Sequence, residues 1–117
     1  MIIGVGVDLC SVQRLTGSIE GTEALATRLF HPNELGKRAE SMAARFAAKE
    51  ALAKAIGNPK ILSWSEIEIV QDELGKPSFV FHGATAKALA DKGDWRYHLS
   101  LSHDAELAQA FVVVESN

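Results

Sequence analysis

Cysteine is almost missing from this chain, since Cys10 is the only one among 117 residues. One thiol cannot close a disulfide within the chain, and without a second cysteine a structural zinc site is disfavoured, so we expect Cys10 to pack in the interior. Long apolar runs are also missing, because none approaches the ~20 residues that span a bilayer. No basic residue precedes the first acid, Asp8, which does not fit a secretory signal. These absences predict a cytoplasmic protein without a membrane segment.

Excess positive charge is lacking as well. The formal net charge is −3, with 12 Lys and Arg against 15 Asp and Glu, so the chain as a whole does not fit a nucleic-acid binder. Its 47% apolar and 23% charged residues are ordinary for a globular protein. At this length we expect one domain over residues 1–117, and its limited capacity to bury surface makes assembly plausible.

Several catalytic motifs are missing too. The chain has no G-x-x-x-x-G-K-S/T phosphate loop, and Gly4–Gly6 lacks the third glycine of a dinucleotide fingerprint. Without a G-x-S-x-G elbow, Ser100 and Ser102 have no support as nucleophiles. No H-x-x-x-H or H-E-x-x-H spacing occurs, which disfavours a histidine-ligated zinc hydrolase. Kinase, dehydrogenase and hydrolase functions of these kinds are therefore not expected.

The hydrophobic pattern predicts an α+β domain. The longest helical segment covers residues 33–56, is rich in Ala, Glu, Lys and Arg, and ends at Gly57 shortly before Pro59. Alternation over 64–71 and 78–82 predicts a β-hairpin. The other predicted elements are strands over 2–9, 95–102 and 107–115, and helices over 11–19, 22–30 and 84–92. We expect an antiparallel sheet packed on the one long helix.

Two charged residues of the long helix are the first candidates for a functional site. Glu50 and Lys54 are four residues apart, so they lie about 40° from each other around the helix axis. The simplest interpretation is an exposed ion pair, as for most such spacings. Glu50 is nevertheless flanked by small and apolar residues, and a carboxylate at such a packing surface needs a partner. The flanking residues are Phe46, Ala47, Ala51 and Ala53.

Asp8, at the end of the first predicted strand, is a candidate partner for Glu50. Together the two carboxylates would supply the oxygen ligands that magnesium prefers. The alternative is that Asp8 caps the helix that follows it. From these residues alone, both the cap and a divalent-cation site near Lys54 remain open.

Three segments resemble the holo-acyl-carrier-protein synthase family. Gly4–Leu9, continuing to Arg14, is similar to the opening G-x-D-x-x-x-x-x-R pattern of the family, and Arg45–Gly57 matches its R-F-A-x-K-E-A-x-x-K-A-x-G helix without a break. Ser100–Asp104 is close to the family's S-x-S-H turn. Arg28–Phe30 with Glu34, and Gly75–Pro77 at the hairpin, add weaker similarities, so the resemblance covers nearly the whole chain.

The resemblance implies an activity and an assembly. It implies a magnesium-dependent enzyme that transfers the 4′-phosphopantetheine arm of coenzyme A to a serine of apo-acyl carrier protein. The products would be holo-acyl carrier protein, used in fatty acid biosynthesis, and adenosine 3′,5′-bisphosphate. The family has the 4′-phosphopantetheinyl transferase fold and assembles as a homotrimer with active sites between subunits, so a trimer is expected here.

The same resemblance implies catalytic roles for three residues. Asp8 and Glu50 would hold Mg²⁺, which neutralises charge on the pyrophosphate of coenzyme A. Glu50 would also help to deprotonate the attacking serine, whereas Asp8 would hold the metal only. Lys54 would face the pyrophosphate as a point charge and stabilise the leaving phosphate.

Five residues have implied binding roles. Arg45, Gly57 and His103 match positions that line the coenzyme A site in the family. His103 ends a strand, where a lone histidine is more often structural, so we assign it binding or orientation rather than the role of the base. Arg14 and Arg28 fall in the first two predicted helices, which the family uses to grip the acidic recognition helix of the carrier protein.

Two other functions compete with the transferase. One is an idle relative that binds carrier protein or coenzyme A without turnover, and the other is a metal-dependent phosphoanhydride hydrolase in which water replaces serine. The intact acids and lysine argue against the idle relative. The chain also departs from the family twice: residues 58–63 form a short segment where relatives often have a glycine-rich loop, and His31 stands where threonine is more common.

Overall fold

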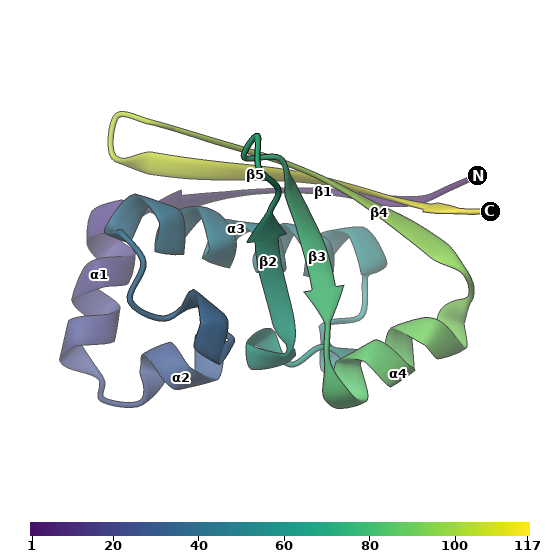
Figure 1. The fold of residues 1–117 in the computed structure, drawn as a ribbon, viewed down its shortest axis with the longest axis horizontal. Coiled ribbons are helices and arrows are strands. Elements are labelled where there is room, and N and C mark those ends of the chain that lie inside the picture. Colours follow the sequence, from purple (N-terminus) through teal and green to yellow (C-terminus); the bar gives the residue numbers. More distant parts are fainter.

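The chain folds as a three-stranded antiparallel sheet lying on one long helix, as the sequence predicts (Figure 1). The computed structural model describes all residues from 1 to 117. The sheet has the strand order β1-β5-β4 and consists of β1 (Ile2–Ser11), β5 (Leu107–Ser116) and β4 (Trp95–Asp104). The long helix, α3 (Ala39–Ile56), packs against β1 and β5.

A hairpin and three smaller helices complete the fold. The hairpin pairs β2 (Ile67–Gln71) with β3 (Pro77–Phe81), and β3 lies next to β4. The helices are α1 (Val12–Gly21), α2 (Leu25–Leu29) and α4 (Gly83–Lys92), and the single 3₁₀ turns are η1 (Pro32–Glu34), η2 (Pro59–Ile61) and η3 (Trp64–Glu66). None of the helices has the length and hydropathy of a membrane-spanning segment.

β1 lies directly on α3 because both elements carry very small residues where they meet. Gly4 and Gly6 alternate onto the strand face that points to the helix. A Cβ added at Gly4 would lie 1.8 Å from the carbonyl oxygen of Ala55, and one at Gly6 would lie 1.8 Å from that of Ala51. Backbone therefore touches backbone, and this contact fixes how far β1 stands from the helix.

Replacing Gly6 by Ala is expected to destabilise the protein. The added methyl group collides with the backbone oxygen of Ala51 rather than with a movable side chain, so β1 must shift. We expect a loss of about 1–3 kcal/mol or more in the free energy of unfolding, measured by urea denaturation. Gly17→Ala in α1 is the matched control, because nothing lies within 4 Å of the added atom. Equal stability losses in the two variants would contradict the close contact.

The long helix begins later than the sequence predicts. It was expected from residue 33, but Pro32–Glu34 form the separate turn η1 and the helix starts at Ala39. Gly36 has a φ of +83°, which is incompatible with a continuous right-handed helix. The C-terminal end was predicted correctly, because Gly57 closes α3 in the left-handed conformation with φ +79°.

Other boundaries also shift. The helix predicted from residue 22 begins at Leu25, after Ala24 adopts a left-handed φ of 73°. The strand predicted from residue 64 begins at Ile67, because the three residues before it form η3. The first strand runs on to Ser11, so Asp8 lies within β1 rather than at its end.

One face of the three-stranded sheet carries no helix or hairpin (Figure 1). Side chains that alternate away from α3 are apolar and exposed on this face, namely Val5, Val7 and Leu9 of β1 and Phe111 of β5. Contiguous exposed apolar surface of this kind is typical of an interaction surface. It fits the predicted self-association.

Candidate active site

The close packing of β1 on α3 brings Asp8 and Lys54 into contact. Asp8 follows Gly4 and Gly6 on the helix-facing side of the strand, where its side chain is 19% exposed. The Lys54 ammonium donates to Asp8 Oδ1 at 3.0 Å and to the backbone oxygen of Val7 at 3.0 Å. The Lys54 side chain is 57% exposed, so it has room to turn toward a ligand.

Glu50 lies one helical turn before Lys54 and is half-buried. Burial raises the pKa of its carboxyl group, the negative charge of Asp8 raises that pKa further, and Lys54 lowers it. The two carboxylates therefore repel each other in a partly desolvated environment, which disfavours the state in which both are ionised. A divalent cation relieves such repulsion, and two carboxylates are the donor set that magnesium prefers. The residues fit a magnesium site.

The geometry argues against both simpler interpretations of these acids. Asp8 is not the cap of α1, because the Ser11 hydroxyl takes that position and accepts a hydrogen bond from the Arg14 backbone N–H at 3.1 Å. Lys54 is not engaged in the expected ion pair along the helix, since its hydrogen bonds go to β1. Lys54 thus connects α3 to β1.

A largely apolar hollow of about 370 Å³ opens next to Asp8 along β1. Arg14 of α1 lines it and is exposed. Arg28 is also exposed, on α2, the helix that supplies part of the same hollow. The apolar residues of the lining that come from the helices are Leu15, Leu25, Leu29 and Phe46.

Arg45 and His103 lie together, but away from the acids. Both line a cavity of about 680 Å³ that also receives Lys37, Arg38 and Ser102. Neither acid reaches this cavity, and Lys54 does not reach it either. Arg45 is nine residues before Lys54, which places the two about 180° apart around α3. Within one chain the predicted coenzyme A contacts are therefore divided between opposite sides of the helix, with Gly57 at the end of α3 that carries Lys54.

Behind Arg45 lies a buried charge cluster whose role was missed in the sequence. Lys49 and Glu34 are fully buried, and the Lys49 ammonium lies 2.6 Å from Glu34 Oε1. Lys49 also donates to the backbone oxygens of Leu29 at 2.8 Å and Trp64 at 3.0 Å. Arg45 Nε lies 3.8 Å from Glu34 Oε2 and has no hydrogen-bond partner of its own.

Glu34 organises that cluster through its backbone contacts. Its side chain accepts hydrogen bonds from the His31 backbone N–H at 2.9 Å and the Ile69 backbone N–H at 2.9 Å. The first of these belongs to a capping box, in which the His31 ring also accepts from Asn33. A cap residue followed three positions later by Glu is a readable signal of this motif. It also gives His31 a structural role that the sequence alone left unexplained.

Comparison with known proteins defines the class. The chain belongs to the 4′-phosphopantetheinyl transferase superfamily, whose family model matches residues 4–112. The holo-acyl-carrier-protein synthase of Clavibacter michiganensis subsp. michiganensis is 53% identical to it over 117 residues, spanning 100% of this chain and 98% of that protein.

Solved structures agree in fold over the whole chain. The holo-acyl-carrier-protein synthase from Neisseria meningitidis has a TM-score of 0.90 and 39% identity, covering 99% of this chain and 100% of that one. The ACPS–CoA complex of Chronobacterium ammoniagenes has a TM-score of 0.85 and 28% identity, covering 97% of each chain. The α+β fold expected from the resemblance is confirmed.

Proposed function

We propose that this chain transfers the 4′-phosphopantetheine group of coenzyme A to a serine of apo-acyl carrier protein. The products are holo-acyl carrier protein, which supports fatty acid biosynthesis in the cytoplasm, and adenosine 3′,5′-bisphosphate. The observation that carries the proposal is the contact of Lys54 with Asp8 at 3.0 Å beside the half-buried Glu50. These residues lie in a chain that is 53% identical to a holo-acyl-carrier-protein synthase.

Each of the three residues has a step that suits its chemistry. Asp8 and Glu50 would hold Mg²⁺, which when bound supplies positive charge for the pyrophosphate oxygens. Glu50 takes the proton of the serine hydroxyl as the serine oxygen bonds to phosphorus. The bond from phosphorus to the bridging oxygen breaks, and the ammonium of Lys54 stabilises the negative charge that the leaving phosphate gains.

A second subunit completes the coenzyme A site in this proposal. Arg45 and His103 line a cavity on a different side of α3 from Lys54, and this division supports a ligand that contacts two chains. We therefore assign Arg45 and His103 of one subunit and Gly57 and Lys54 of its neighbour to the same coenzyme A molecule. A homotrimer with three such sites also covers the exposed apolar face of the sheet.

We assign a separate surface of this chain to binding of the carrier protein. Arg14 and Arg28 are exposed on neighbouring helices beside the apolar hollow that adjoins Asp8. Arginines next to apolar surface suit an amphipathic helix that is acidic on one side. We assign them to the acidic recognition helix of the carrier protein, with its serine directed toward Glu50.

A mass measurement tests the activity. The chain is incubated with coenzyme A, Mg²⁺ and an apo-carrier protein, and the carrier is expected to gain one phosphopantetheine group. The control omits Mg²⁺ and adds a chelator. Coenzyme A that is cleaved without any change in carrier mass would favour the hydrolase, and tight binding without cleavage would favour the idle relative. Running several carrier proteins and acylated coenzyme A in parallel also defines the preferred substrates.

A further inference from the structure

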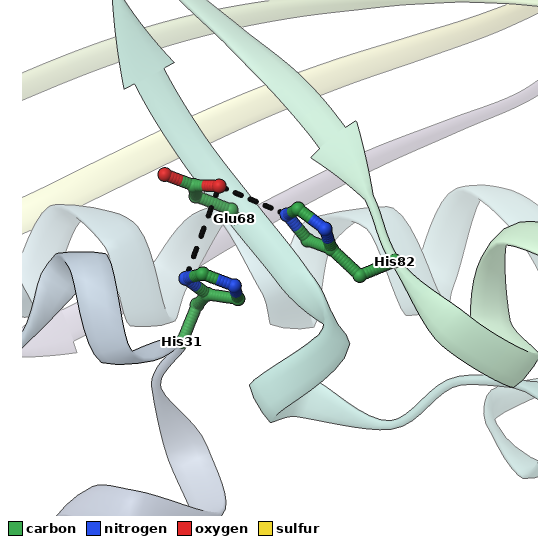
Figure 2. Close-up of side chains that lie close together, drawn as sticks. All are labelled: His31, Glu68 and His82. Carbon is green, nitrogen blue, oxygen red and sulfur yellow. Dashed lines mark hydrogen bonds and ion pairs between the residues drawn. The ribbon is translucent and has the colours of Figure 1, made fainter.

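His31, Glu68 and His82 form a cluster that the transferase does not use. They come from three elements: His31 precedes η1, Glu68 lies in β2, and His82 follows β3 (Figure 2). Glu68 Oε1 lies 2.9 Å from His82 Nε2 and 3.8 Å from His31 Nδ1. None of the three lines the cavity of Arg45 or the hollow beside Asp8.

The cluster holds metal-ligating atoms at close range. One donor atom from each residue lies within 4.8 Å of the others. The donors of a tetrahedral zinc ion with bonds of ~2.0–2.1 Å lie roughly 3.3 Å apart, so the 2.9 Å pair of Glu68 and His82 must open slightly and the wider separations must close. Two imidazole nitrogens and one carboxylate oxygen are a donor set of zinc-class ions, whereas magnesium prefers oxygen alone.

Neighbouring groups orient two of the donors. The side-chain amide of Asn33 donates to Glu68 Oε2 at 3.1 Å, which leaves Oε1 for the histidines. The backbone N–H of Asn33 donates to His31 Nδ1 at 3.1 Å, so this nitrogen carries no proton, and a metal ion bound through it would replace that hydrogen bond. Hydrogen bonds from surrounding groups that fix ligand orientation are a regular part of protein metal sites.

We propose that His31, Glu68 and His82 bind a zinc-class divalent ion, with a fourth position left for water. The two imidazole rings are stacked, with centroids 4.4 Å apart and planes 21° apart, so their in-plane nitrogen lone pairs lie in nearly parallel planes and do not meet at one ion. Binding therefore turns the His82 ring toward the ion. Its side chain is 39% exposed, which gives it the freedom to turn, and the bond from His82 to Glu68 is replaced by bonds to the metal.

The ion would tie together parts of the chain that are far apart in sequence. It joins His31, which precedes η1, to β2 and to the residue that follows β3. A ligand that binds only the folded arrangement shifts the folding equilibrium toward it. Zinc is therefore expected to stabilise the fold, and this effect does not depend on whether the chain transfers phosphopantetheine.

Zinc titration of the purified chain, in the presence of excess Mg²⁺ to occupy the carboxylate pair, tests the site. We expect one Zn²⁺ per chain by calorimetry and a higher melting temperature. Imidazole ¹⁵N resonances of His31 and His82 should shift, while those of His98 should not. The absence of stoichiometric binding, or shifts at other histidines only, would overturn the proposal.

Two substitutions and one matched control separate this site from others. His82→Gln retains a hydrogen-bond donor to Glu68, and His31→Asn retains a capping oxygen for η1. Each is expected to weaken zinc binding by at least about tenfold and to abolish the rise in melting temperature. His98→Gln is the control, because His98 also pairs with a carboxylate, Glu115 at 2.7 Å, but has no second histidine. Unchanged affinity in both test variants contradicts the site, and the resonances of the wild-type chain decide the question if a variant fails to fold.

Discussion

Glu50→Gln is expected to lower the rate of magnesium-dependent phosphopantetheine transfer by roughly 10²–10⁴-fold, with the fold unchanged. The amide keeps the shape of the side chain but loses the charge that binds the metal and the capacity to take a proton from serine. Asp8→Asn should raise the Mg²⁺ concentration needed for half-maximal rate, because Asp8 serves the metal only. The measurement is initial rate against Mg²⁺ concentration, with circular dichroism to verify folding.

Glu73→Gln is the matched control for these variants. Glu73 is exposed in the turn between β2 and β3 and lies outside both cavities. It should retain the wild-type rate and Mg²⁺ dependence. Full activity in both Glu50→Gln and Asp8→Asn would remove the metal pair from the site and leave the fold assignment intact.

Trimers assembled from two different variants test whether each active site is shared between two subunits. Asp8→Asn and His103→Ala chains are co-expressed, so that some interfaces pair an intact Asp8 with an intact His103. If the site spans two subunits, random mixing restores about a quarter of the sites. If each chain holds a whole site, the activity of the mixture is only the average of the two variants.

Glu34→Gln is expected to cost about 3–5 kcal/mol of the free energy of unfolding, because it leaves a buried ammonium without its counter-charge. Lys49 is fully buried, and burial lowers its pKa against the raising effect of Glu34. The substitution also weakens the anchors to the backbone of His31 and Ile69. Urea denaturation followed by circular dichroism measures the loss.

A double variant shows whether the charge is responsible. Lys49→Met removes the ammonium but keeps a flexible apolar chain over Phe30, whose ring centroid lies 4.9 Å from the Lys49 nitrogen. Glu34→Gln combined with Lys49→Met should be more stable than Glu34→Gln alone, because the buried ammonium that the single variant leaves unpaired is removed. Losses that simply add would indicate that the two side chains contribute independently.

Local sequence patterns correctly predicted the features that depend only on residues close together in the chain. The C-terminal end of α3 at Gly57 follows from residue type and position, and it is confirmed. The spacing of Glu50 and Lys54 placed them on one side of the helix. That Lys54 bonds to β1 was not predictable, because this contact depends on how closely two elements approach.

The remaining differences have two sources, local interruptions of the chain and contacts between distant segments. The predicted start of α3 was wrong, because the capping box at His31 and the left-handed Gly36 interrupt a segment whose composition favours a helix. Searching for histidine pairs one helical turn apart could not find His31 and His82. A turn and a hairpin bring them together, across more than forty residues of chain.

The direct contact of β1 with α3 has a consequence for anyone who alters this enzyme. Since only main-chain atoms meet at Gly4 and Gly6, the offset between the strand and the helix has no adjustable part. Repacking elsewhere in the core cannot be absorbed there by a change of rotamer. The distance between Asp8 and Glu50 is thus a property of the scaffold rather than of the two acids, and a graft that copies the acids without the glycines would lose it.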